Sequence, residues 1–220
     1  MQNREGFIIK VLGIVGSKRK DGNTSMLVQR VIQTVKEEGI ETEVIFLGDY
    51  SIADCTGCEG CKDTYECVVE DDMQKIYPSL IGADAIILGS PTYFYNVSAD
   101  VKAFIDRCYC FEVFAADDRS VWMGIHEVLG GKYAVVIAVC EQFSEEDMGY
   151  TAEGMAKPLE ALGYRVIDTI KALRLFKKGE VLKDENKNVL DQTTKAGKKL
   201  AKTLKLRKEV ERKLLKNKAF

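Results

Sequence analysis

Histidine is nearly absent from this chain: its 220 residues include a single one, His126. That scarcity excludes metal sites built from several imidazoles and leaves little room for a histidine-based catalytic triad. Long apolar runs are absent as well, since no stretch approaches the ~18 residues that a membrane-spanning helix needs. The N-terminal residues also lack the pattern of a secretory leader. We therefore expect a soluble, cytoplasmic protein with no membrane partner.

Two nucleotide-binding fingerprints are missing too. The loop that follows the first predicted strand reads GSKRKDGNT, which matches neither G-x-G-x-x-G nor the P-loop pattern. It is nevertheless rich in groups that bind phosphate: hydroxyls, an arginine, and backbone amides at the start of a helix. The same residues also suit an ordinary turn in which Asn23 or Thr24 only caps the helix. From this loop by itself, both interpretations stand.

Charge is distributed unevenly, although the net charge is only −2. Residues 171–220 carry 17 Lys and Arg against 6 Asp and Glu, so the rest of the chain is acidic. A basic C-terminal arm can bind nucleic acid, or it can fold back on the acidic body or on a neighbouring subunit. We favour folding back and expect no nucleic-acid partner, because no aromatic side chain that could stack bases occurs between residues 177 and 219.

Apolar periodicity switches repeatedly between the pattern of a buried strand and that of an amphipathic helix. It predicts strands at residues 7–16, 41–49, 84–91, 131–139 and 164–170, and helices at 23–39, 71–83, 97–109 and 145–163. This alternation predicts an α/β fold, namely a flavodoxin-like doubly wound five-stranded parallel sheet with a cysteine-rich insertion after strand 2 and a helical C-terminal tail. Ligands of such sheets bind beyond the carboxyl ends of the strands, so we searched the loops there.

The chain divides into two predicted parts. Residues 1–186 form the sheet domain, which includes a cysteine segment at 50–70, and residues 187–220 form a basic helical extension. Within the sheet domain, residues 111–131 make a longer connection. It either covers an exposed face of the domain or contributes to the ligand site at the carboxyl ends of the strands. Pro78 is expected to kink or limit the helix at 71–83.

The loop after the third strand, GSPTYFYN, places three aromatic side chains next to one another at Tyr93, Phe94 and Tyr95. A flat heteroaromatic ring needs such a platform, whereas the alternative is that these rings pack into the core or an oligomer interface. Read with the first loop, residues 7 to about 170 resemble the flavodoxin-like NADPH-dependent FMN reductase superfamily. The resemblance lies in G-S-x-R-x-x-x-N-T, in S-P-x-Y, and in the helix segment KAFIDR that follows.

That resemblance implies that sheet residues 1–186 bind FMN. The residues it implies for the phosphate are Ser17, Arg19, Asn23, Thr24 and Ser25, and those for the isoalloxazine ring are Pro91, Thr92, Tyr93, Phe94, Tyr95 and Asn96. From the loop after the fourth strand, Cys140 to Phe143 are expected to approach the ring, with Cys140 as the assigned contact. Asp106 and Arg107 are interpreted as a structural ion pair. No side chain is expected to act as a catalytic acid or base, because the flavin supplies the chemistry.

Four of the seven cysteines lie within residues 55–67, CTGCEGCKDTYEC. Disulfides are disfavoured in a reducing compartment, a thioredoxin-like C-x-x-C leaves two thiols unexplained, and structural zinc usually has a longer spacer between its cysteine pairs. Three thiols spaced by two residues are typical of iron–sulfur ligation, and the spacing favours a single local cluster. Cys108 and Cys110, at the end of a predicted helix, are expected to be buried structural thiols.

A compact cysteine run after the second strand of a flavodoxin-like domain is similar to the iron-sulfur flavoproteins. This resemblance implies that Cys55, Cys58, Cys61 and Cys67 bind one 4Fe-4S cluster. It further implies an electron-transfer flavoprotein that passes electrons between an iron–sulfur carrier and a small oxidant, acting as a homodimer or homotetramer with the cluster and flavin approaching across a subunit interface. Ferredoxin or NAD(P)H is the expected redox partner.

Two alternatives remain. The first is that the chain is a cluster-free NAD(P)H-dependent FMN or quinone reductase. The second is that it is a zinc-stapled binding module with a basic tail, although this explains neither GSKRKDGNT nor SPTYFYN.

Overall fold

A central five-stranded parallel sheet forms the body of the protein in this computed structural model, which describes residues 8–217. The strand order is β2-β1-β3-β6-β7, and the strands span Lys10–Val15 (β1), Glu41–Phe46 (β2), Ala85–Pro91 (β3), Lys132–Val139 (β6) and Tyr164–Ala172 (β7). The order reverses between β1 and β3, as in a flavodoxin-like doubly wound sheet. The predicted α/β class and the flavodoxin-like sheet of five parallel strands are confirmed, while Phe7 of the first predicted strand lies outside the described residues.

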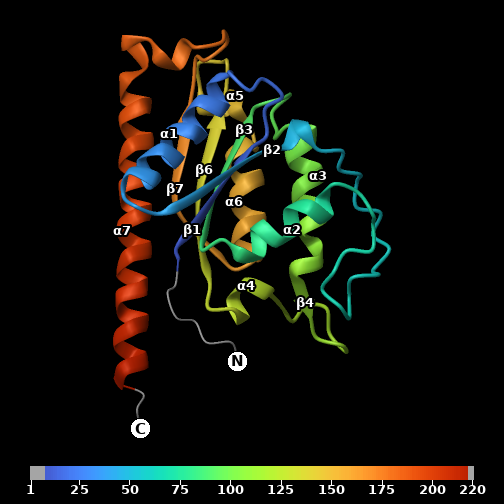
Figure 1. The fold of residues 1–220 in the computed structure, drawn as a ribbon. Coiled ribbons are helices and arrows are strands. Elements are labelled where there is room, and N and C mark those ends of the chain that lie inside the picture. The colour runs from blue at the N-terminus through green and yellow to red at the C-terminus, as the bar shows by residue number, and fades with distance from the viewer. Residues whose placement is uncertain (1–7, 218–220) are drawn as a thin grey trace.

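Helices cover both faces of the sheet (Figure 1). On one face lie α1 (Asn23–Glu37) and α7 (Lys187–Asn217), and on the other lie α2 (Met73–Gly82), α3 (Ala99–Arg107) and α6 (Thr151–Ala161). Side chains alternate between the two faces, so Val11 and Val15 pack toward α1 whereas Leu12 and Ile14 pack toward α2 and α3. Because β1, β3 and β6 are buried on both faces, they read as nearly continuous apolar runs.

Two predicted helices differ from expectation. The helix predicted at 145–163 is divided into α5 (Glu145–Met148) and α6, because Gly149 adopts a φ of +56° between them and lies against the backbone of Tyr95. Pro78 does not end α2, which continues to Gly82.

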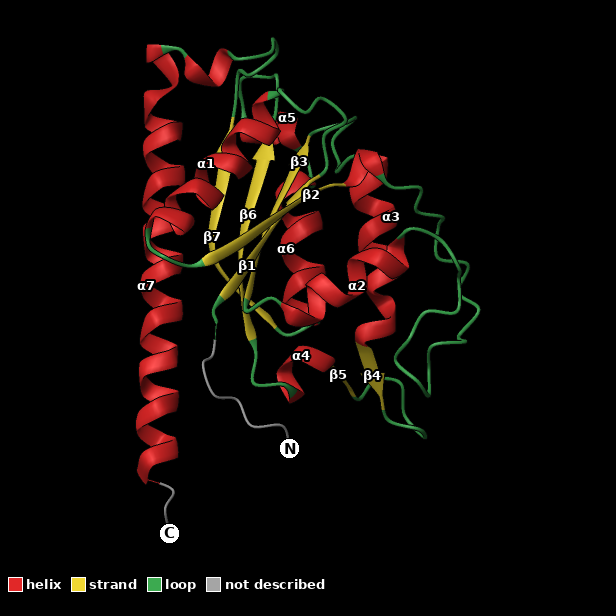
Figure 2. Cartoon of the chain, in the orientation of Figure 1, coloured by secondary structure: helices red, strands yellow, loops and turns green. Residues whose placement is uncertain are grey.

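The long connection at 111–131 is more ordered than predicted. Figure 2 shows a short antiparallel hairpin, β4 (Glu112–Phe114) with β5 (Trp122–Gly124), followed by the single-turn helix α4 (Ile125–Val128). Short 3-10 turns complete the described elements at Leu47–Asp49 (η1), Cys108–Phe111 (η2), Glu180–Leu182 (η3) and Asp184–Asn186 (η4).

The basic C-terminal arm folds back on the body as the helix α7. Its apolar face, which includes Leu200 and Leu204, is buried against α1. Its lysines pair with carboxylates of the body, with 2.8 Å between Lys205 Nζ and Glu38 Oε2 and 3.2 Å between Lys208 Nζ and Asp84 Oδ1. The predicted helical tail is therefore confirmed, apart from residues 218–220, which lie outside the described part of the chain. Within residues 8–217, no helix combines the length and apolarity needed to cross a membrane.

Candidate functional site

The structure places two hollows where the sequence directed attention. The first, called the edge pocket below, lies at the carboxyl edge of the sheet, beyond β1, β3, β6 and β7. Its lining consists of Ser17, Arg19, Gly22, Asn23, Thr24, Pro91, Thr92, Tyr93, Val139, Glu141, Leu175, Phe176 and Lys178. It therefore unites loops from four separate strands, as the topology requires of a ligand site in this fold.

The loop between β1 and α1 is pressed tightly against its neighbours. A Cβ atom at Gly16 would lie 2.0 Å from Val101 Cγ2, so only glycine fits there. The Ser98 hydroxyl donates to the carbonyl of Gly16 at 2.7 Å, and the backbone N–H of Arg19 donates to Ser17 Oγ at 3.2 Å. These contacts fix the loop in a conformation that carries Ser17 and Arg19 to the pocket.

Two of the predicted phosphate-binding side chains are engaged elsewhere. Asn23 lines the edge pocket, but its amide donates to the carbonyl of Lys177 at 2.9 Å and accepts from the N–H of Val181 at 3.2 Å. Ser25 is fully buried, and its hydroxyl donates to the carbonyl of Lys20 at 2.5 Å. Asn23 thus anchors the loop after β7, and Ser25 closes the turn before α1.

The loop after β3 contributes an unsatisfied hydroxyl. Thr92 Oγ1 is buried and has no hydrogen-bond partner among the described residues, although Thr92 lines the edge pocket. A buried hydroxyl without a partner is unfavourable, so this atom fits a site that receives a polar ligand. It is the observation that best supports a flavin in the edge pocket.

The three aromatics of this loop do not act as one group. Tyr93 lines the edge pocket although it is 55% exposed, whereas Phe94 and Tyr95, at 96% and 55% exposed, do not line it. Phe94 and Tyr95 both adopt left-handed backbone conformations, with φ of 49° and 68°, within a turn closed by hydrogen bonds between Tyr93 and Asn96. Two consecutive non-glycine residues in this region are strained, a feature typical of binding sites.

One predicted flavin contact does not line the pocket, and five residues that line it were not predicted. Cys140 is buried, and its neighbours Val139 and Glu141 line the pocket instead. The residues that were not predicted are Gly22, Val139, Leu175, Phe176 and Lys178. Three of them follow β7, which ends at the same edge of the sheet as the other strands.

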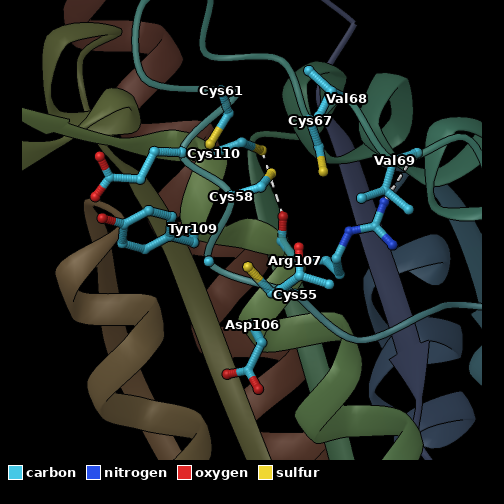
Figure 3. Close-up of a pocket in the computed structure, with 13 residues that line it drawn as sticks. Cys55, Cys58, Cys61, Cys67, Val68, Val69, Asp106, Arg107, Tyr109 and Cys110 are labelled. Atoms are coloured by element: carbon cyan, nitrogen blue, oxygen red, sulfur yellow. Dashed lines mark hydrogen bonds between the residues drawn. The ribbon is translucent and has the colours of Figure 1, made fainter.

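The second hollow, called the cysteine pocket below, lies between the segment at residues 50–72 and the end of α3. Figure 3 shows the sulfur atoms of Cys55, Cys58, Cys61 and Cys67 around one space, together with a fifth sulfur from Cys110. Cys110, which was expected to be a structural thiol, is buried as expected, but it also lines this pocket. The four predicted ligands are therefore gathered, and a fifth thiol joins them.

Arg107 joins the two ends of the cysteine segment. Its side chain is fully buried, and its guanidinium donates to the carbonyl of Ala53 at 3.0 Å, before the first cysteine, and to the carbonyl of Val69 at 3.2 Å, after the last. It also makes an ion pair with Asp71, at 2.5 Å between Nη1 and Oδ2. The predicted pairing of Arg107 with Asp106 is wrong, because α3 turns Asp106 to the surface, where Lys102 binds it.

Other side chains strengthen the same closure. Asp71 and Asp72 accept the backbone N–H groups of Ala53 and Ser51, both at 2.8 Å. Gln74 donates to the carbonyls of Cys67 and Val69 at 2.8 Å and 2.9 Å. The sequence VVEDDMQ after the last cysteine thus supplies the groups that hold the segment closed.

The thiols of the cysteine pocket differ in acidity. Burial by itself raises the pKa of Cys67, but hydrogen bonds from the Val69 backbone, Arg107 and Tyr77 outweigh it, so that the pKa is lowered overall. Burial raises the pKa of Cys61, and the neighbouring thiols raise it further. The Arg107 side of the pocket therefore favours a thiolate, which is the form that binds metal.

The thiols of this pocket do not form a site for a single metal ion in the described part of the chain. Among residues 8–217, no three Cys, His, Asp or Glu side chains converge closely enough to hold one metal ion. Ligands of a cubane cluster bind four separate irons and are consequently spread farther apart. The five thiols and the adjacent guanidinium fit such an anionic group.

Comparison with known proteins gives a consistent result. Residues 9–146 match the family described as NADPH-dependent FMN reductase. Among curated relatives, an iron-sulfur flavoprotein of Methanocaldococcus jannaschii is 48% identical over 99 residues, covering 45% of this chain and 51% of that protein. An iron-sulfur flavoprotein of Archaeoglobus fulgidus is 34% identical over 156 residues, covering 71% of this chain and 60% of that protein. The matched part thus spans about half the length of these relatives.

Solved structures share the fold. A flavone reductase superposes with a TM-score of 0.65 at 20% identity, covering 90% of this chain and 63% of the other. An FMN-dependent NADH-azoreductase from Bacillus anthracis in complex with FMN superposes with a TM-score of 0.63 at 15% identity, covering 88% and 99%. At these identities the likeness establishes the fold alone.

Proposed function

Because the chain belongs to the NADPH-dependent FMN reductase family, we propose that it is a flavin-dependent oxidoreductase with FMN in the edge pocket and one 4Fe-4S cluster in the cysteine pocket. The observation that carries this proposal is the presence of both hollows in one chain. The iron-sulfur flavoproteins among its relatives support the cluster, and the family match supports FMN. The resemblance inferred from the sequence is thereby confirmed at the level of the family.

In the edge pocket the protein binds and orients the cofactor. We assign the phosphate to the loop of Ser17, Arg19 and Thr24, where hydroxyls and the amino end of α1 favour an anion. Lys178 adds a second cation at the same pocket. The Thr92 hydroxyl then hydrogen-bonds a polar atom of the flavin, and the aromatic ring of Tyr93 packs against its flat ring system. When bound, FMN supplies one- and two-electron redox chemistry.

In the cysteine pocket, the thiolates of four cysteines would each bind one iron of the cluster; they are Cys55, Cys58, Cys61 and Cys67. Arg107 keeps the two ends of the segment together and places positive charge beside the thiolates. An iron–sulfur cluster there supplies one-electron transfer. A ferredoxin or NAD(P)H is the proposed electron donor, and a small oxidant is the acceptor.

The two hollows have no lining residue in common. We therefore propose that the cluster of one copy faces the flavin of another in a homodimer or homotetramer. Three exposed aromatics near the edge of the sheet, Phe94, Phe143 and Phe176, supply apolar surface for such contact.

The proposal is tested by purifying the protein without oxygen and measuring its absorption spectrum with its iron, sulfide, zinc and flavin contents. We expect about four irons and one FMN per chain. Flavin without iron after anaerobic reconstitution would leave a cluster-free NAD(P)H-dependent reductase, an alternative favoured by the NADPH-dependent description of the family. Colourless protein containing zinc would support the zinc-stapled module instead.

A further inference from the structure

The cysteine pocket contains one more thiol than a four-iron cluster requires. Cys110 belongs to η2 at the end of α3, far along the chain from the compact motif, yet it lines the same pocket as the four predicted ligands. In Figure 3 its sulfur lies among theirs. The fold, rather than the motif, brings this thiol to the site.

The position of Cys110 is fixed by rigid neighbours. Its side chain is 3% exposed, and its Sγ donates to the carbonyl of Arg107 at 3.5 Å. Cys61 and Cys67 line the same pocket. Cys110 is thus held beside two predicted ligands by groups that do not depend on the loop at residues 57–60.

Cys58 is in the opposite situation. It is the exposed member of the four, whereas Cys55, Cys61 and Cys67 are partly buried. It lies between Gly57 and Glu59, which both have left-handed backbones, with φ of 66° and 56°. Because exposed thiolates are those that oxidants reach, Cys58 is the ligand most readily lost.

Cys108 provides a comparison that distinguishes a ligand role for Cys110 from simple packing. Cys108 is also 3% exposed and belongs to the same short turn. It does not line the cysteine pocket; it lines an apolar cavity with Ile86, Phe104 and His126, and a separate, open hollow next to Cys55. If buried thiols were there only to fill space, Cys108 and Cys110 would be equivalent.

We propose that Cys110 is a reserve ligand that replaces Cys58 on the cluster when the Cys58 thiol is lost. The exchange forms one iron–sulfur bond to Cys110 in place of the bond to Cys58, releases the Cys110 proton to water, and transfers no electron. This inference rests on the proposed function, since it requires the cluster.

The test compares iron and acid-labile sulfide per chain, and the electron paramagnetic resonance spectrum of the reduced protein, across matched variants. Cys58→Ala is expected to keep more than about half of the wild-type iron, with a shifted spectrum from the new ligand. Cys58→Ala with Cys108→Ala should behave in the same way. Cys58→Ala with Cys110→Ala is expected to retain about tenfold less iron, and Cys110→Ser in place of Cys110→Ala should repeat that loss while preserving the shape of the side chain.

The outcomes distinguish failure of the reserve ligand from failure of the proposed function. Wild-type protein that takes up no iron would overturn the proposed function, and the reserve ligand with it. If wild type binds the cluster but Cys58→Ala loses it as fully as the double variant, only the reserve ligand is overturned. A three-iron cluster in Cys58→Ala that is unaffected by Cys110→Ala would also overturn it. Far-ultraviolet circular dichroism and bound FMN verify that each variant is folded.

Discussion

The edge pocket and the cysteine pocket are built on different principles. The edge pocket is formed by the ends of paired strands, so the hydrogen bonds of the sheet hold its loops in place. The cysteine pocket is formed by the end of α3 and by residues 50–72, which contain neither helix nor strand and are held by side-chain contacts at their two ends. Topology determines the first site, and a few tethers determine the second. Single substitutions should therefore dismantle the cysteine pocket while sparing the edge pocket.

The largest effect is expected for Arg107→Met. The substitution leaves the Asp71 carboxylate without its buried partner and frees both ends of the cysteine segment, which should lower the free energy of unfolding by about 3–5 kcal/mol. Urea unfolding measures the loss, and iron content should fall far more than FMN content in the protein that remains folded.

Lys102→Met provides the matched control on the same helix. Lys102 pairs with Asp106 on the surface, and such i,i+4 pairs contribute only about 0.3–0.5 kcal/mol. An Arg107→Met protein with wild-type iron content, or with stability as little changed as the control, would show that the tether does not define the cysteine pocket.

The difference between the two regions also explains what the sequence predicted. Strand and helix periodicity located the sheet, so residues such as Ser17 and Thr92 could be assigned to its carboxyl edge before the structure was known. Spacing within CTGCEGCKDTYEC identified the four thiols in the same way. Both kinds of signal are local.

Contacts between distant segments were not predictable from spacing. Cys110 reaches the cysteine pocket only through the packing of α3, and Arg107 selects Asp71 rather than its neighbour Asp106 because of the direction it faces on that helix. Lys178 lies in the loop after β7, whose position at the pocket follows from topology alone, because parallel strands all end at one edge of the sheet.

Acid should affect both pockets together, because it acts on the shared body. His126 is fully buried between Phe111 and Tyr164, and burial, assisted by the charge of Lys132, lowers its pKa to about 3. The unfolded chain binds a proton at His126 below about pH 6.5 while the folded chain does not, so stability falls as pH drops below that value. Between pH 7 and pH 5 the expected loss is about 2 kcal/mol.

His126→Phe tests this by keeping an aromatic ring and removing the titration. Urea unfolding at pH 7, 6 and 5 should give a flatter dependence for the variant than for wild type, whatever its stability at pH 7. Equal slopes would mean that His126 is not the group responsible. If wild type loses iron and FMN at the same pH, the whole sheet domain has unfolded. If iron is lost first, only the contacts that hold the cysteine segment have been released.

A smaller and more local effect is expected for Thr92→Val. The substitution removes the unpartnered hydroxyl of the edge pocket but retains the shape of the side chain, so FMN should bind about tenfold more weakly while iron content is unchanged. Fluorescence titration of the flavin-free protein measures the affinity. Thr34→Val is the control, since Thr34 is also buried but bonds to Arg30 within α1. Unchanged FMN affinity in Thr92→Val would show that the Thr92 hydroxyl does not contact the flavin.

The smallest effect concerns the strained rim of the edge pocket. Phe94 adopts a φ of 49° while its ring is 96% exposed, so its backbone strain is not offset by burial. Asparagine tolerates this conformation better, and Phe94→Asn should therefore raise the free energy of unfolding by about 0.5 kcal/mol. Phe143→Asn, at an exposed aromatic without positive φ, should give no such gain. A stability gain in both variants would trace the effect to exposed apolar surface, whereas a gain in Phe94→Asn alone would mean that the sheet framework holds the rim of the edge pocket in a strained backbone conformation.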